Sequence, residues 1–66
     1  MMRDIGKNIR DLRQQKHLTQ EELAERLFVT RQTISNYENG RTRPDVDQIL
    51  RLAEIFDTDA NAVLYG

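Results

Sequence analysis

The feature that most constrains this chain is the spacing of its apolar residues, which recur with a helical period and never alternate as in a strand. Ile5, Ile9 and Leu12 lie at positions i, i+4 and i+7, so they share one face of a first helix. No run of residues approaches the ~18 consecutive apolar residues of a membrane span. The pattern therefore predicts an all-α fold.

Capping residues divide the rest of the chain into further short helices. Residues 19–22 (TQEE) form a capping box, because the Thr19 hydroxyl can accept from the Glu22 amide while the Glu22 carboxylate accepts from the Thr19 amide. The sequence Asn39-Gly40 predicts the end of the third helix, since glycine tolerates the left-handed conformation. N-cap candidates for three later helices follow at Thr30, Asp45 and Asp59. We therefore expect a compact bundle of five short helices.

The apolar residues of the later helices predict the faces that turn toward the core. In the second and third helices these residues are Leu23, Ala24, Leu27, Ile34 and Tyr37. In the fourth helix they are Val46, Ile49, Leu52, Ala53 and Phe56. The last helix contains Val63, Leu64 and Tyr65, and part of this set is expected to complete the core. Part of the last group is also expected to form a seam between two copies of the chain.

The length of 66 residues predicts one domain spanning residues 1–66, with a small core that buries roughly 60% of the surface of the unfolded chain. The chain has no cysteine, which excludes disulfides and cysteine-based zinc fingers and leaves helix packing or oligomerisation to stabilise it. The absence of cysteine fits a reducing compartment, and the N-terminus carries no signal-peptide pattern. We therefore expect a cytoplasmic protein.

The charges are unevenly distributed along the chain. The net charge is −1, whereas nucleic-acid-binding domains are typically basic. Residues 1–43 nevertheless hold nine Lys/Arg and six Asp/Glu, a net of +3, and residues 44–66 hold one Arg and five acids, a net of −4. This split permits one face for phosphates and another for a different partner. A mixed solvated surface is the alternative explanation.

Two short helices joined by about three residues match the helix-turn-helix unit. The strings LTQEELAERL (residues 18–27) and VTRQTISNYENG (residues 29–40) closely resemble the lambda-repressor-like family of Cro/C1 or Xre type. The resemblance extends over nearly the whole chain, including Pro44 and LAEIF at residues 52–56. It implies a bacterial or phage transcriptional regulator that acts as a repressor, whose third helix enters the major groove of a palindromic operator as part of a dimer.

The recognition helix is expected at about residues 31–38. At about 100° per residue, Gln32 and Asn36 lie side by side about 160° from the apolar Ile34. Arg31 and Thr33 flank them near the helix start, so these four residues are the candidates for base contact. Glutamine can pair bidentately with adenine, and arginine with guanine. In the alternative, this face contacts only solvent and no DNA.

Phosphate contacts are expected on both sides of the recognition helix. By resemblance, Gln20 at the start of the second helix would hold a phosphate, helped by the unpaired amides there. Arg41 and Arg43 follow the third helix and are expected on the DNA backbone, with a solvated basic loop as the alternative. Arg10 of the first helix is a further phosphate candidate.

Two charged residues occupy positions that face the core. Arg13 lies four residues after Ile9 and Glu38 four after Ile34, which places each about 40° from an apolar stripe. The resemblance implies that they pair and tie the first helix to the end of the third, which would offset the cost of burying each charge. In the alternative, both long side chains reach out to water.

Two positions depart from the pattern of the family. Phe28 stands in the turn between helices 2 and 3, where glycine is frequent in the family. If the backbone has a positive φ at this position, phenylalanine would cost on the order of 1 kcal/mol, because its Cβ crowds the backbone there. A turn of different geometry, with Phe28 covering a surface of helix 3 or 4, is the alternative. His17 also stands where glycine is frequent, and histidine tolerates the left-handed region better than most residues.

The sequence argues against an enzyme. Ser35 is the only serine and His17 the only histidine, so no Ser-His-Asp or Cys-His arrangement arises, and one histidine makes a poor metal site. No cofactor is expected, because no glycine-rich phosphate loop is present.

The competing interpretation is an antitoxin that binds a partner protein and also represses its own promoter. A protein partner, either a toxin or an antirepressor, would find a surface on the acidic C-terminal part. Leu50 and Ile55 are turned away from the main apolar stripe of the fourth helix there. The same residues, with Val63, Leu64 and Tyr65, are candidates for a homodimer seam.

Overall fold

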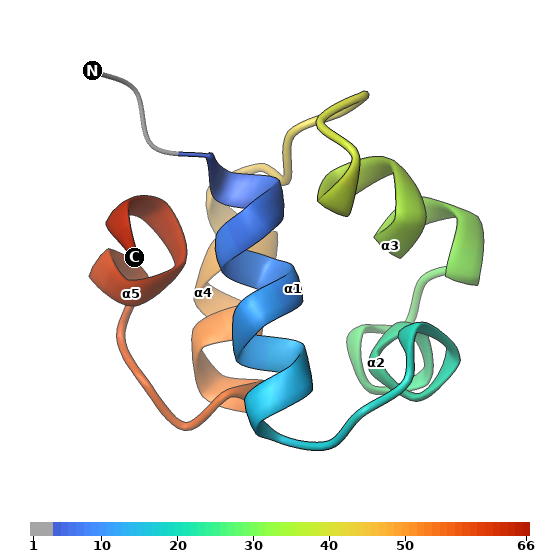
Figure 1. Cartoon of the computed structure of the whole chain (residues 1–66), viewed down its shortest axis with the longest axis horizontal. Helices are drawn as coiled ribbons and strands as arrows, with labels where there is room; N and C mark the ends of the chain where they lie inside the picture. The colour runs from blue at the N-terminus through green and yellow to red at the C-terminus, as the bar shows by residue number, and fades with distance from the viewer. Residues whose placement is uncertain (1–3) are drawn as a thin grey trace.

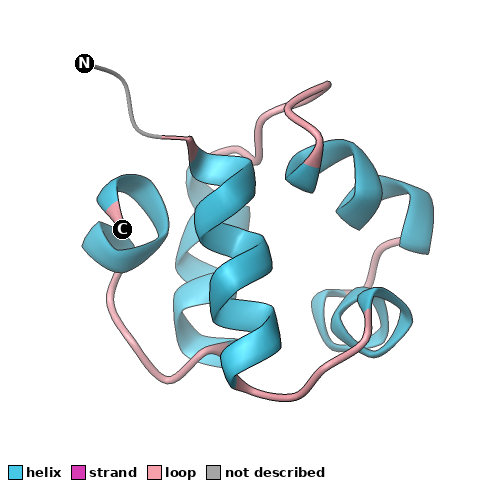
Figure 2. Cartoon of the chain, viewed as in Figure 1, coloured by secondary structure: helices cyan, strands magenta, loops and turns pink. Residues whose placement is uncertain are grey.

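The computed structural model describes residues 4–66. Within that range the chain forms helices and loops with no strand, which confirms the predicted all-α bundle of five short helices (Figure 2). The helices are α1 (Ile5–Gln15), α2 (Gln20–Leu27), α3 (Arg31–Glu38), α4 (Val46–Ile55) and α5 (Ala60–Tyr65). No helix in this part of the chain is long and apolar enough to cross a bilayer.

Helix α1 lies between the other elements (Figure 1). It packs against α3 on one side and α5 on the other, while α2 packs against both α3 and α4, and α4 packs against α5. The α2–α3 pair and α5 thus lie on opposite sides of α1 in Figure 1. This arrangement leaves one side of α3 without a covering helix.

Every helix begins with a side-chain cap. The side chains of Asp4, Thr19, Thr30, Asp45 and Asp59 each accept a hydrogen bond from the backbone N–H three residues later. The predicted capping box is present at α2, where the Glu22 amide donates to Thr19 Oγ1 at 3.0 Å and the Thr19 amide donates to Glu22 Oε1 at 2.9 Å. Such caps fix the helix boundaries, because they satisfy amides that have no partner within the helix.

The core draws apolar side chains from all five helices and from the loop before α2. Its members are Ile9, Leu18, Leu23, Ala24, Leu27, Ile34, Tyr37, Ile49, Leu52, Ala53, Phe56 and Val63. The prediction for Val46 was wrong, because that side chain is 71% exposed. Val46 is the first residue of α4, where it borders an open groove.

Between residues 4 and 66, three residues other than glycine adopt the left-handed conformation at helix ends. They are His17 (φ 57°), Phe28 (φ 60°) and Asp57 (φ 57°). Phe28 is 85% exposed, so the alternative in which it covers α3 or α4 was wrong. The backbone takes the glycine-type turn there even though the residue is phenylalanine.

Candidate nucleic-acid interface

Helix α3 is bounded by a cap at each end. The Thr33 amide donates to Thr30 Oγ1 at 3.3 Å, which satisfies one free amide of the first turn. At the other end Gly40 has φ 75°, its amide donates to the Tyr37 carbonyl at 3.2 Å, and the Arg41 amide donates to the Asn36 carbonyl at 2.9 Å. This is the Schellman arrangement, and it places Arg41 directly beyond the end of α3.

The inner side of α3 is anchored in the core. Ile34 is completely buried and Tyr37 is nearly so. Burial raises the pKa of the Tyr37 hydroxyl, and the negative charge of Asp45 adds to the rise, whereas a hydrogen bond with Gln48 opposes it. The buried hydroxyl thus stays protonated to a higher pH than an exposed tyrosine would.

Glu38, the last residue of α3, accepts hydrogen bonds from two other helices. Arg13 of α1 donates from Nε to Oε2 at 2.7 Å and from Nη2 to Oε1 at 3.2 Å. Gln20 of α2 donates from Nε2 to Oε1 at 3.0 Å. The side chain of Glu38 is only 2% exposed and that of Arg13 is 12% exposed. The residues expected to pair therefore lie in contact, inside a three-helix network that we call the Glu38 cluster.

Arg10 joins the Glu38 cluster from its solvent edge. Its Nη2 donates to the Glu38 carbonyl at 3.3 Å, and its Nε lies 3.8 Å from Glu38 Oε1, with 44% of the side chain exposed. Arg13 also donates from Nη1 to the Leu18 carbonyl at 2.8 Å, which ties the α1–α2 loop to the cluster. Within residues 4–66, no buried polar side-chain atom lacks a hydrogen-bond partner.

The outer side of α3 is polar and open to solvent. Arg31 and Gln32 are exposed, and Thr33 and Asn36 are half-buried. Gln32 Nε2 donates to Asn36 Oδ1 at 3.0 Å, so the two amides adjoin as their spacing predicts. The Thr33 hydroxyl lies 3.0 Å from the hydroxyl of Thr30, at the start of the helix. The four candidates for base contact are thus brought together on one helix.

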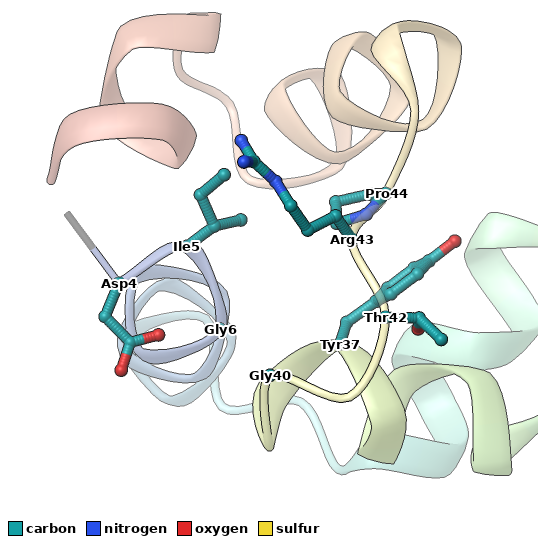
Figure 3. A pocket seen from close by; sticks show the side chains of 8 residues that line it. All are labelled: Asp4, Ile5, Gly6, Tyr37, Gly40, Thr42, Arg43 and Pro44. Carbon is teal, nitrogen blue, oxygen red and sulfur yellow. The ribbon is translucent and has the colours of Figure 1, made fainter. Parts of the chain in front are cut away.

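The candidates for phosphate contact are placed less uniformly. Gln20 and Arg10 belong to the Glu38 cluster, so each already uses donors within the protein. Arg41 is exposed beside the end of α3. Arg43 lines a hollow of about 240 Å³ between the start of α1 and the loop after α3. Figure 3 shows its side chain extending across this hollow toward Ile5.

The α2 capping box also has an electrostatic consequence. The backbone amide and hydroxyl of Thr19 hold the pKa of the Glu22 carboxyl below its ordinary value of 4.5, and the charge of Arg26 adds to the effect. Glu22 is therefore ionised at neutral pH, where the carboxylate can accept from the Thr19 amide. The box keeps the N-terminus of α2, including Gln20, in a fixed position.

Sequence reasoning did not identify the hydrogen bond from Gln20 to Glu38. Gln20 and Glu38 are 18 positions apart on two different helices, so no local spacing in the sequence indicates their contact. The packing of α2 against α3 brings them together. Within the described range, no three His, Cys, Asp or Glu side chains gather so that they could hold a metal ion.

The family model for the helix-turn-helix matches residues 9–62 of this chain. Among relatives, the chain is 33% identical to the HTH-type transcriptional regulator ImmR of Bacillus subtilis (strain 168), over 91% of this chain and 47% of that protein. It is 37% identical to the ImmF control region 10 kDa protein of Bacillus phage phi105, over 89% of this chain and 66% of that protein. The chain thus spans about half to two thirds of the length of these relatives.

Three solved structures show how widely the fold is used. The P22 c2 repressor in complex with synthetic operator 9T superposes with a TM-score of 0.86 at 26% identity, covering 94% of each chain. The restriction-modification controller protein C.AhdI from Aeromonas hydrophila superposes with a TM-score of 0.86 at 30% identity, covering 92% of each chain. Hydroxypropylphosphonic acid epoxidase from S. wedmorenis also gives a TM-score of 0.86 at 26% identity, but only 32% of that enzyme is covered.

The match to the family model spans most of the chain and takes in all of α2 and α3. The match also includes the N-caps of α2 and α3 and the αL turn at Phe28 that joins these two helices. The chain belongs to the helix-turn-helix family.

Proposed function

We propose that this domain binds double-stranded DNA in a sequence-specific manner and acts as a transcription regulator, most simply a repressor. The observation that carries the proposal is the division of α3 into two sides. Its inner side is fixed by Ile34, Tyr37 and the Glu38 cluster, while its outer side presents polar groups to solvent. A rigid helix with such an outer side is suited to the major groove. The likeness to the P22 c2 repressor, whose structure contains an operator, supports the same function.

In this proposal the outer side of α3 reads the bases. Gln32 and Arg31 supply the groups that pair with adenine and guanine, and Thr33 offers its methyl or hydroxyl group. Asn36 lies one turn further along the same side. Arg41 and Arg43 contact phosphates after α3, and Gln20 and Arg10 contact phosphates with the donors that the Glu38 cluster leaves free.

The function is tested by comparing a substitution at a residue that reads bases with a substitution at a residue that holds a phosphate. Gln32→Ala should weaken binding to the selected operator by about 1–3 kcal/mol and barely change binding to random duplex DNA. Arg41→Ala is the matched control, since it should weaken both DNAs similarly and lower the salt slope by about one unit. Binding of each variant to both duplexes across a salt series measures the difference. Equal weakening of both DNAs by Gln32→Ala would contradict base reading by α3.

The same proposal includes a homodimer. A groove of about 480 Å³ runs between α4 and α5, bordered by the apolar side chains of Val46, Leu50 and Leu64. Leu50 in this groove is 49% exposed, and Tyr65, the last residue of α5, is 58% exposed. Val63, in contrast, is fully buried in the core and does not reach this surface. Two copies joined here would place two recognition helices on one duplex, with half-sites roughly 34 Å apart.

Sedimentation of the purified protein tests the dimer. Leu50→Glu should shift a dimer toward monomer, because it introduces a charge into an apolar seam. Arg51→Glu is the matched control, since Arg51 is exposed on the same helix and does not border the groove. A monomeric wild-type protein that protects a single asymmetric half-site would contradict the dimer.

We propose that residues 1–66 form one non-catalytic domain that acts in the cytoplasm, associated with the nucleoid. Since the relatives extend beyond the matched region, the activity of a whole regulator is inferred only as far as this domain supplies it. A partner such as a toxin or an antirepressor would be recovered by co-purification from the native host, and a simple repressor would be recovered without one.

A further inference from the structure

The hydrogen bond between Gln32 and Asn36 determines which polar atoms these two amides offer to a ligand. Gln32 Nε2 donates to Asn36 Oδ1 at 3.0 Å. A primary amide has two N–H donors and a carbonyl acceptor, so Gln32 keeps one donor and its acceptor oxygen. Asn36 keeps both N–H donors, while its oxygen already accepts one hydrogen bond. The two side chains have the same chemistry but are not equivalent once they are joined.

The remaining groups match two different bases. Adenine presents an acceptor at N7 and a donor at N6 in the major groove, which complement the free N–H and oxygen of Gln32. Guanine presents two acceptors, N7 and O6, which complement the two N–H donors of Asn36. With the amides bonded in this direction, Gln32 is suited to adenine through its free N–H and its oxygen, and Asn36 is suited to guanine through its two N–H groups.

The spacing of the two amides matches that of stacked bases. Residues four apart on an α-helix are separated by about 6 Å along its axis. The hydrogen bond draws the amide groups together to 3.0 Å between Nε2 and Oδ1. Successive bases on one strand are about 3.4 Å apart. Two amides held in contact are suited to neighbouring base pairs.

From these observations we infer that Gln32 and Asn36 act as one reading unit, which recognises an adenine and an adjacent guanine in each half-site. The inference rests on the DNA-binding function proposed above. Asn36 has two roles in it, since it contacts guanine through its N–H groups and orients the Gln32 amide through its oxygen. Base preference at the two positions is consequently coupled.

Selection of binding sites from random duplex DNA tests the coupling. The wild-type protein should prefer adenine at one position and guanine at its neighbour, each by about tenfold. Asn36→Ala should reduce both preferences, because Gln32 loses the acceptor that orients it. Asn36→Asp keeps an oxygen for Gln32 but lacks the N–H donors, so it should keep the adenine preference and lose the guanine preference. Ratios of preference are compared, so a general loss of affinity from the added negative charge cancels.

A control on the same helix is Ser35→Ala, which should leave both preferences unchanged, since the Ser35 hydroxyl bonds to Asn39 and lies outside the bonded pair. Thermal unfolding of each variant checks that the fold is retained. If wild-type protein selects no sequence at all, the proposed function itself fails. If it selects a sequence but Asn36→Ala leaves the adenine preference intact, or the neighbouring base is not guanine, only the inference of a coupled pair is overturned.

Discussion

Arg13 of α1 and Glu38 of α3 are joined by two parallel hydrogen bonds, with Nε 2.7 Å from Oε2 and Nη2 3.2 Å from Oε1. The carboxylate is almost completely shielded from water, so its charge is balanced by the guanidinium rather than by solvent. Such a pair is geometrically specific, because the planar fork of arginine matches the two carboxylate oxygens. It fixes the C-terminal end of α3 against α1.

Removing Arg13 should therefore destabilise the domain strongly. We expect Arg13→Ala to lower the free energy of unfolding by about 3–5 kcal/mol, because Glu38 is left as a buried and poorly compensated charge. Urea unfolding followed by circular dichroism measures the change. Arg10→Ala is the control, since this side chain is 44% exposed and its Nε lies 3.8 Å from the carboxylate, so its loss should cost no more than about 1 kcal/mol. Equal losses for the two variants would mean that the fork of Arg13 has no special role.

At Gly6, α1 packs directly against the backbone at the end of α3. A Cβ at this position would meet the backbone carbonyl oxygens of Tyr37 and Glu38, the latter at 2.6 Å. Gly6→Ala should lower the free energy of unfolding by about 1–3 kcal/mol through overpacking, in spite of the better helix propensity of alanine. Thermal and urea unfolding measure this loss.

Gly40→Ala provides a comparison of different origin. An added Cβ meets nothing within 4 Å there, but φ is +75°, so only backbone strain of about 1 kcal/mol is expected. If Gly6→Ala stabilised the protein, helix propensity would outweigh the contact and α1 would have room to move away from α3.

Phe28 occupies a left-handed turn without the benefit of burial. Its φ is 60° and its side chain is 85% exposed, so Phe28→Gly relieves strain while it removes little apolar contact. We expect the free energy of unfolding to rise by about 1 kcal/mol, measured in urea. His17→Gly, at φ 57°, should behave similarly. A loss of stability for Phe28→Gly would show that the exposed ring makes contacts that stabilise the fold.

The Glu22 capping box predicts a dependence of stability on pH. The pKa of Glu22 is lower in the folded state than its ordinary value of 4.5, so its contribution is present above that pH. It is lost as the pH falls through the lower, folded-state pKa. Urea unfolding of wild-type protein and Glu22→Gln from neutral to acidic pH should give curves that converge in acid, because glutamine caps without titrating. Parallel curves over the whole range would contradict the assignment.

Much of the architecture could be predicted because it rests on local signals. The caps at Thr19, Thr30, Asp45 and Asp59 act within three residues, and apolar spacing determines which side of each helix is buried. For Val46, apolar spacing predicted burial and was wrong. Its helical position suits the core, but its burial depends on whether another helix extends far enough to cover it, and none in the described chain does.

The candidate site shows the same division. The adjacency of Gln32 and Asn36 follows from a spacing of four residues, so it could be predicted from the sequence. The bond from Gln20 to Glu38 depends on the packing of α2 against α3, and periodicity alone contains no information on it. For Phe28, the turn geometry is set by the helices that it joins, and the side chain follows the backbone into solvent.

The two sides of α3 also bear on how such a domain can change its target. In the part of the chain that the structure describes, Glu38 and Tyr37 make side-chain hydrogen bonds from α3 to other helices, whereas the Gln32 and Asn36 side chains bond only to each other. Substitutions on the outer side leave the core and the Glu38 cluster untouched. An ancestor and its descendant could thus differ in operator and share the same folding stability, so that new specificities arise without an unstable intermediate.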